Sequence, residues 1–357
     1  MPTPLCLSRP STWNLLRALA LGLPFLAVIP SPGAAIDELA AFSGFEKVDL
    51  HRLADGEILA NSETAMGDSR DIFVETCFLV HAPAESAAGA LQTWNPADHA
   101  PLGVLLHRPI QSPPQETDFQ ALKLDASQPF VRWFLTKTLA TSREKSDLYL
   151  SREEAATIVA TLGPLVPDAR QTAVPALWKG LLLKRAAAFD RGGLAALPAY
   201  RRGGEEIAPL GEAQRLIKQE PEVSAHFDAL LKATCLTPSP AGPRPMAQAY
   251  WELSKVTDHA TLGIGTIFVR REGDTFQAVD CQHYSSGSLY VSLVLSQLWP
   301  VVVDGKPMTL FWRGDFLSSP SLAGTRGTER MACGAIMVQE IKKAVRFFRE
   351  DAEKVAK

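Results

Sequence analysis

The segment from Asp280 to Trp312 holds the densest group of chemically reactive side chains in the sequence. Its first eleven residues contain a thiol, an imidazole, two phenols and three hydroxyl groups. An imidazole titrates near neutral pH and can act as a general base, and a phenol can polarise a carbonyl group. His283 and Tyr284 are therefore the first candidates for catalysis or ligand binding. The alternative is that both make structural hydrogen bonds within a strand.

Strand periodicity predicts how these side chains are distributed. Successive side chains of a strand point to opposite faces, which puts Cys281, His283 and Ser285 on one face and Tyr284 on the other. Gly287 within a strand pattern predicts a bulge or a close backbone approach. No nucleophile is paired with a base in this arrangement.

Other motifs are incomplete. Cys281 and His283 with the distant His259 are candidate metal ligands, but the sequence has no Cys-x-x-Cys and no His-Glu-x-x-His, so packing in the core is favoured. The Ser-x-x-Lys pattern at 142–145 lacks its companion motifs, and Gly263-Ile-Gly265 lacks the third glycine of a dinucleotide loop. The sequence therefore predicts no catalytic residue, metal or cofactor.

Aromatic residues crowd the last third of the chain and predict either a filled core or the wall of a pocket. Arg313 could pair with the anionic head of a ligand, or with Asp315. The candidate ligand-binding residues are Trp251, His283, Tyr284, Tyr290, Trp299, Trp312 and Arg313.

Composition indicates an ordinary globular protein. The chain has 357 residues, 46% of them hydrophobic, and a net charge of −3. This mild acidity, without a run of Lys or Arg, argues against nucleic acid as a partner.

The N-terminus reads as a secretory signal peptide over residues 1–35. Arg9 and Arg17 precede a short apolar run, 18–29, and the small residues around Ala35 suit cleavage. The apolar run is shorter than the ~20 residues of a spanning helix, so removal is favoured over an uncleaved anchor, which would be the only contact with a membrane. Export to the periplasm or the extracellular space is predicted. Oxidising conditions there allow up to two disulfides among Cys77, Cys235, Cys281 and Cys333, and buried free thiols are the alternative.

Residues 36–357 are predicted to form a single α+β domain. It starts with a strand at 72–80, a helix from about 82 and a strand at 102–110. A helical insert follows at 128–232, with helices expected at 128–139, 151–162, 176–190 and 211–232, and Thr237–Pro245 is a Pro-rich linker. Strands are then expected at 262–271, 275–283, 288–299 and 308–312, with turns at Gly273-Asp274 and Asp304-Gly305, before a long helix that starts after Thr328.

This order of elements predicts an antiparallel sheet with helices on one side. A curved sheet around a long C-terminal helix resembles the helix-grip arrangement of START-like proteins, which implies a cavity for an apolar ligand between helix and sheet. A likeness of this kind concerns the fold and does not establish a function.

A second resemblance, to an uncharacterised family of exported bacterial proteins, is carried by segments spread over most of the chain. The segment 256–265 lacks the Gly-x-Lys-Pro expected of that family. The resemblance implies one continuous unit and no particular activity. Its matching segments are Ser146–Ser151, Phe189–Tyr200, Tyr250-Trp251 and His283-Tyr284 with Ser288-Leu289.

The sequence thus favours an exported, non-catalytic protein that binds a lipid or another apolar or amphipathic small molecule in a cavity between sheet and helix. The alternatives are a hydrolase that uses His283 and an envelope interaction protein with a fully packed core.

Overall fold

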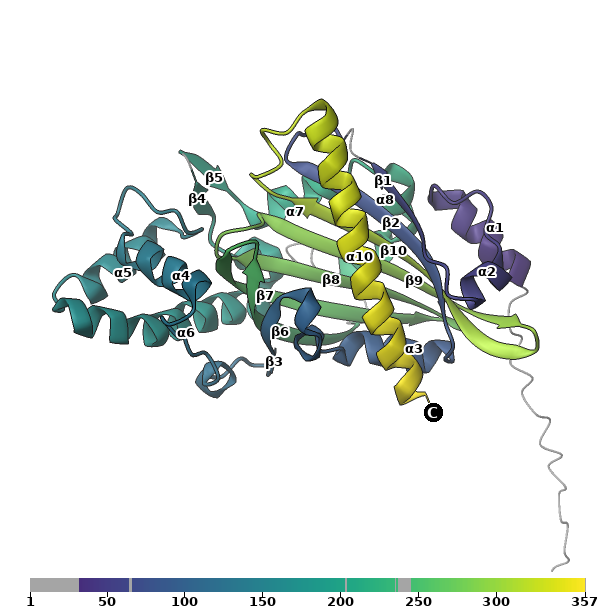
Figure 1. Ribbon diagram of the computed structural model, residues 1–357, viewed down its shortest axis with the longest axis horizontal. Coiled ribbons are helices and arrows are strands. Elements are labelled where there is room, and N and C mark those ends of the chain that lie inside the picture. The colour runs from purple at the N-terminus through teal and green to yellow at the C-terminus, as the bar shows by residue number, and fades with distance from the viewer. Residues whose placement is uncertain (1–31, 64–65, 203, 235, 237–244, 357) are drawn as a thin grey trace, which may run out of the picture.

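Apolar and β-branched segments form an eight-stranded antiparallel sheet in the computed structural model, which describes residues 32–63, 66–202, 204–234, 236 and 245–356 (Figure 1). The spatial order is β1-β2-β10-β9-β8-β7-β6-β3, so the last five strands form a continuous meander. The strands are β1 (Leu59–Glu63), β2 (Asp71–Val80), β3 (Val104–Ile110), β6 (Met246–Val256), β7 (His259–Glu272), β8 (Thr275–Ser285), β9 (Val291–Val303) and β10 (Lys306–Ser318). The predicted α+β class with a long C-terminal helix is confirmed.

The C-terminal helix α10 (Gly327–Val355) lies across one face of the sheet, together with α3 (Ala84–Thr93) (Figure 1). Its apolar stripe, which includes Ile341, Val345 and Phe348, packs in one core cluster with strand residues such as Phe311 and Leu298. The helix buries this stripe because apolar residues recur at helical spacing along it.

Helices also cover the opposite face, whereas the sequence predicted helices on one side only. They are α1 (Pro32–Phe42), α2 (Leu50–Ala54), α7 (Pro209–Ile217), α8 (Pro221–His226) and α9 (Asp228–Ala233). Their apolar residues share a core cluster with Trp299, Trp312 and Leu295 of the sheet. Strands buried on both faces explain the second layer, since every residue of β2 is buried.

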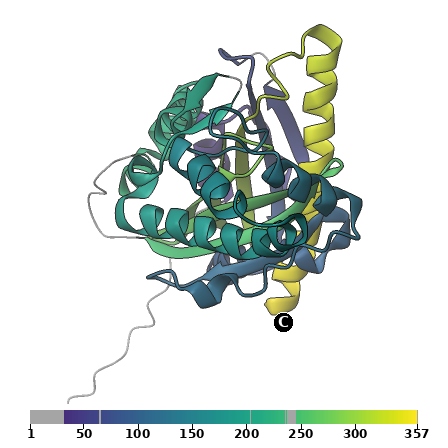
Figure 2. The same ribbon diagram turned by 90° about the vertical axis from the view of Figure 1, so that its left-hand side faces the viewer.

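The predicted helical segment 128–232 contains more irregularity than its pattern suggested. It holds α4 (Pro129–Leu139), α5 (Arg152–Leu162), α6 (Pro167–Gly192) and the hairpin of β4 (Tyr200–Arg202) and β5 (Glu205–Ile207), followed by α7–α9. Pro221 interrupts the helix predicted at 211–232, because its ring cannot continue a helix interior. Figure 1 shows α4–α6 gathered at one end of the sheet, the end that faces the viewer in Figure 2. Short 3₁₀ helices occupy Pro96–Asp98 (η1), Ala100–Leu102 (η2), Glu116–Phe119 (η3) and Gly193–Ala196 (η4).

A bulge falls at His283, not at the predicted Gly287. Ile264 of β7 pairs with Tyr284, while the next residue, Gly265, pairs with Gln282, so His283 is the extra residue of β8. The bulge changes the parity of the strand. His283 and Tyr284 therefore both face the helical layer of α6, and the prediction of opposite faces for them is wrong.

The predicted turns are present at both hairpins. Gly273 has a φ of +61° between β7 and β8, and Asp304 and Gly305 have φ of +51° and +71° between β9 and β10. Two successive positive φ values fit the Asp-Gly pair of a tight hairpin.

The predicted signal segment lies almost wholly outside the described residues. Ala35, its last residue, belongs to α1 and is buried. The linker segment 237–244 and Cys235 also lie outside the described part, whereas Cys77 and Cys333 carry free thiols. No helix among the described residues is long and apolar enough to cross a membrane.

Candidate functional site

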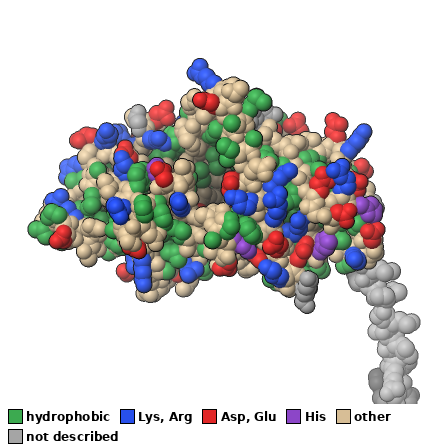
Figure 3. Space-filling view, in the orientation of Figure 1, with side chains coloured by type: hydrophobic (Ala, Val, Ile, Leu, Met, Phe, Trp, Pro, Cys, Tyr) green, Lys and Arg blue, Asp and Glu red, His purple; other side chains and the backbone are tan. Residues whose placement is uncertain are grey.

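A cavity of about 430 Å³ lies on the sheet face that carries α10. Its floor is formed by β6–β10, its wall by β3, and its roof by the end of α3 and the start of η1. Figure 3 shows that this face of the molecule is hollowed near its centre, beside α10. We call it the Asp280 cavity. Its polar residues are Gln92, Thr93, Asn95, His107, Arg108, Gln248, Tyr250, Glu252, Asp280, Ser296 and Arg313, and its apolar residues are Leu91, Trp94, Pro96, Pro109, Ile267, Ala278 and Val294.

The central polar contact joins Tyr250 of β6 to Asp280 of β8, across the intervening strand β7. The Tyr250 hydroxyl donates a hydrogen bond of 2.9 Å to one Asp280 carboxylate oxygen. The phenol passes over Gly265, where a Cβ atom would lie 2.3 Å from the ring. Only glycine leaves room for this side chain to cross β7.

A second contact repeats this arrangement one step along the sheet. Gln282 donates a hydrogen bond of 2.9 Å to Glu252, and a Cβ atom on Gly263 would lie 2.6 Å from the Gln282 amide nitrogen. Gly263 and Gly265 thus leave room above β7 for two hydrogen bonds, each between a polar side chain of β6 and one of β8. Its glycines serve side-chain packing in the sheet and not phosphate binding.

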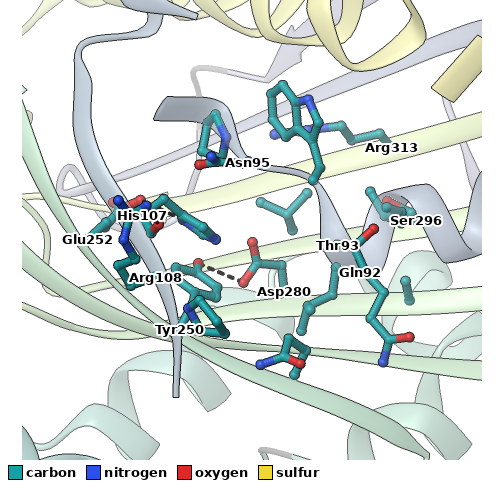
Figure 4. A pocket seen from close by; sticks show the side chains of 18 residues that line it. Gln92, Thr93, Asn95, His107, Arg108, Tyr250, Glu252, Asp280, Ser296 and Arg313 are labelled. Atoms are coloured by element: carbon teal, nitrogen blue, oxygen red, sulfur yellow. Dashed lines mark hydrogen bonds and ion pairs between the residues drawn. The ribbon is translucent and has the colours of Figure 1, made fainter. Parts of the chain in front are cut away.

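Burial dominates the electrostatics of the central pair. It raises the pKa of Asp280 to about 6, an increase that the nearby Glu252 charge supports and that the Tyr250 hydrogen bond and Arg313 charge oppose. Burial and the Asp280 charge likewise raise the pKa of Tyr250 well above its usual value, so this phenol stays protonated and acts as the donor. Figure 4 shows the second Asp280 oxygen pointing into the cavity.

The roof of the cavity is tied to α10. Trp94 donates an indole hydrogen bond of 3.2 Å to Asp351 and meets Phe348 edge to face at 5.8 Å. On the wall, the His107 ring stacks on Tyr250 with centroids 4.6 Å apart. The roof is thereby fixed to α10, and the wall to the central pair, by aromatic contacts.

Arg313 is the one predicted ligand-binding residue that lines the Asp280 cavity. Its guanidinium donates hydrogen bonds of 2.7 and 2.6 Å to Asp315. Burial opposes its positive charge, but the Asp315 carboxylate outweighs this effect and raises the pKa of Arg313. Of the two partners expected for Arg313, a ligand anion or Asp315, the structure shows Asp315 in place.

Five other predicted ligand-binding residues are buried in separate cores. Trp299 and Trp312 pack under the opposite helical layer and donate indole hydrogen bonds to Glu38 and Glu75. Trp251 and Tyr284 pack against α4–α6, and Tyr290 belongs to a small aromatic cluster near the β4–β5 hairpin. The structure does not bring these five side chains together around one cavity.

His283 lines a different cavity, on the opposite face of the sheet. Neither of its ring nitrogens has a hydrogen-bond partner in the described part of the chain, and the Phe189 ring stacks on it with centroids 3.8 Å apart. A general base needs a hydroxyl, thiol or acid within hydrogen-bond reach, and among the described residues no such group is hydrogen-bonded to His283. Among the described residues, no group of three or more His, Cys, Asp or Glu side chains is arranged to hold a metal ion.

Apart from Arg313, the residues that build the Asp280 cavity were not predicted from the sequence. Asp280 stood at the start of the reactive segment but was assigned no role, and β6, which carries Tyr250 and Glu252, was not predicted as a strand. The two glycines of β7 were the available signal, because glycine inside a strand marks a place where other groups approach the backbone.

Comparison with known proteins found no matching family model, no matching curated protein and no matching solved structure. The function is therefore argued from the geometry of the site.

Proposed function

We propose that this protein binds an amphipathic small molecule in the Asp280 cavity and does not transform it. One observation carries the proposal. A half-buried carboxylate, Asp280, accepts a hydrogen bond from Tyr250 through one oxygen and presents its other oxygen to a cavity of about 430 Å³. A ligand that donates a hydrogen bond to this second oxygen would add a polar contact inside a largely apolar pocket, which is how such sites fix the orientation of a ligand.

The lining defines the chemistry of the ligand. Ile267, Ala278 and Val294 form an apolar floor for a hydrocarbon body, and Asp280 stands beside them as a hydrogen-bond acceptor. A carboxylate with a pKa of about 6 is ionised at pH 7.5. The matching ligand therefore has an apolar body and a cationic or strongly donating head, such as an amine.

The test compares two probes of equal length, decylamine and decanol, by calorimetric titration. At pH 7.5 we expect decylamine to bind roughly tenfold more tightly, because its ammonium group pairs with the carboxylate. At pH 5 the protonated carboxyl loses this preference. Asp280→Asn should abolish the preference at both pH values while the variant stays folded.

Occupancy of the cavity is tested by filling it. Val294→Phe adds bulk to the floor and should weaken both probes at least fivefold, whereas Ser292→Phe, on the same strand but outside the lining, is the matched control. Equal affinities of the two probes at pH 7.5, or no saturable binding to the folded chain, would overturn the proposal. Binding without catalysis predicts that a ligand copurified with the protein keeps the same mass after incubation with it, as measured by native mass spectrometry.

We also infer export from the basic and apolar character of residues 1–35, so the natural ligand would be one found in the periplasm or outside the cell. Cell fractionation with N-terminal sequencing of the mature chain tests this inference. A chain found in the cytoplasm with its first residues intact would contradict it.

A further inference from the structure

A second cavity, of about 440 Å³, lies on the sheet face opposite the Asp280 cavity. Its walls are β6, β7 and β8, the last turn of α6, and the segment that follows β3. About half of its lining residues are apolar: Pro109, Ile110, Pro114, Ala186, Phe189, Ala233, Pro245, Ala247, Ala249, Ile264 and Phe268. Its polar residues are Gln111, Ser112, Asp190, Arg191, Thr234, Gln248, Thr266 and His283. We call it the His283 cavity.

Two buried polar side chains that line this cavity, His283 and Thr266, lack hydrogen-bond partners among the described residues. His283 is 1% exposed, and both its Nδ1 and Nε2 atoms are without a hydrogen bond within the described chain. Thr266 also lines the cavity and is 4% exposed, and its Oγ1 atom likewise has no hydrogen-bond partner within the described chain. Nearly all buried polar side-chain atoms in folded proteins are hydrogen-bonded, so three such atoms around one apolar space point to a missing partner.

Backbone geometry explains how an imidazole comes to face this space. His283 is the extra residue of the β8 bulge. The bulge interrupts the alternation of side chains along the strand, so the His283 side chain points to the face covered by helix α6. Phe189 of α6 stacks on the ring at an interplanar angle of 7° and fixes its plane. With one ring face covered, the ring edge carries the two unpartnered nitrogen atoms, which have almost no exposed surface, so a ligand must displace neighbouring side chains to reach them.

The imidazole is uncharged here. Burial, with a smaller contribution from the Arg185 charge, lowers the pKa of His283 to about 3. A neutral imidazole has one donor nitrogen and one acceptor nitrogen. The charged lining residues Asp190 and Arg191 are exposed, whereas His283 is buried among apolar residues, and such surroundings disfavour a charged guest. A hydroxyl group, which can donate and accept, suits these partners.

We propose that the His283 cavity is a second binding site, which takes an uncharged, largely apolar molecule whose hydroxyl group hydrogen-bonds to the unpartnered His283 imidazole. The Thr266 hydroxyl offers that group a further partner. This site is separate from the Asp280 cavity and selects by a different chemistry, a neutral alcohol or phenol in place of an amine.

The experiment uses 2-naphthol and naphthalene as matched probes on the full chain at pH 7.5. One hydrogen bond to a buried partner contributes about 0.5–1.5 kcal/mol, so we expect 2-naphthol to bind roughly two- to tenfold more tightly than naphthalene. Binding should also shift the NMR signals of the His283 ring.

His283→Phe keeps a ring against Phe189 and removes both unpartnered nitrogens. It should eliminate the preference for 2-naphthol while the thermal midpoint stays the same or rises. His51→Phe, at an exposed position, is the control and should leave the preference intact.

Competition separates the two sites. Val294→Phe and excess decylamine should leave 2-naphthol binding unchanged, even if the Asp280 cavity proves to bind nothing. The proposal is overturned if the folded chain binds neither aromatic probe, if it binds both equally, or if the preference persists in His283→Phe.

Discussion

Tyr250 and Asp280 are joined by a hydrogen bond of 2.9 Å across a strand that neither belongs to. The contact depends on Gly265, whose missing side chain lets the phenol lie flat over β7. A carboxylate is thereby stabilised on a sheet face that is otherwise packed against helices. The same feature makes the site sensitive to changes in a residue that carries no functional group.

Gly265→Ala is expected to displace the Tyr250 ring, because the new Cβ atom would lie 2.3 Å from the phenol. Overpacking of this kind costs about 1–3 kcal/mol of unfolding free energy. Urea denaturation measures the loss, and it should be accompanied by weaker binding of decylamine.

A control and a second variant isolate the cause of that loss. Gly287→Ala, at a glycine with nothing within 4 Å of the added atom, should change the free energy of unfolding by less than ~0.5 kcal/mol. Gly265→Ala combined with Tyr250→Ala should cost less than the sum of the two single changes, since the clash is gone. Additive costs would show that Gly265 does not act through Tyr250.

Asp280 should make the stability of the protein fall between about pH 4 and pH 6. A carboxyl of the unfolded chain titrates near 3.9, whereas burial raises the pKa of Asp280 to about 6. Between these values the folded chain binds more protons than the unfolded chain, so the free energy of unfolding decreases as pH rises and stays lower above pH 6. A difference of ~2 between the pKa values corresponds to about 3 kcal/mol.

Asp280→Asn removes this titration and keeps an acceptor for Tyr250. Relative to the wild type, the variant should gain on the order of 3 kcal/mol between pH 4 and pH 7, measured by urea denaturation at each pH. For Asp37→Asn, at an exposed position on α1, the free energy of unfolding should change with pH in the same way as that of the wild type. A parallel curve for Asp280→Asn would contradict burial as the cause.

Sequence periodicity was sufficient for most strands of the sheet and for the long helix, because these elements bury apolar residues at regular intervals. The stripe of Ile341, Val345 and Phe348 on α10 repeats at helical spacing, and the Asp304-Gly305 pair has the φ values of a tight turn. Local pattern and tertiary packing agree at these places, so a single sequence predicts them.

The candidate site was harder to predict from the sequence because it depends on contacts between residues far apart in the chain. His283 and Tyr284 share a face because of a bulge, and a bulge is set by pairing with β7, which no local pattern specifies. Tyr250 and Asp280 are thirty residues apart and meet only once strand order is known. Aromatic side chains such as Trp312 were expected either to fill a core or to line a pocket, because composition alone does not distinguish the two outcomes, and Trp312 fills a core.

Cys77 and Cys333 should differ sharply in reactivity. Burial, with help from the nearby Glu75 charge, raises the pKa of the Cys77 thiol, so little thiolate forms and reagent cannot reach it. Iodoacetamide at pH 8 should label the partly exposed Cys333 in the native chain and label Cys77 only after urea is added, as read by peptide mass spectrometry. Equal labelling of both in the native state would contradict the packing of β2.

The ion pair between Arg185 of α6 and Glu154 of α5 should be the costliest contact to break within the helical segment. Arg185 is 1% exposed and donates hydrogen bonds of 2.7 and 2.6 Å to Glu154, while its guanidinium lies 4.0 Å from the centre of the Tyr284 ring. Removing one partner leaves a buried charge uncompensated, at a cost of about 3–5 kcal/mol.

Glu154→Ala should therefore lower the free energy of unfolding by that amount in urea denaturation, and Glu153→Ala, its exposed neighbour on α5, by far less. Replacing both partners with apolar residues, Glu154→Leu with Arg185→Met, should recover much of the loss because no unpaired charge remains. A double variant as unstable as Glu154→Ala would mean that the helix cap that Glu154 forms with Ser151, and not the ion pair, accounts for the effect.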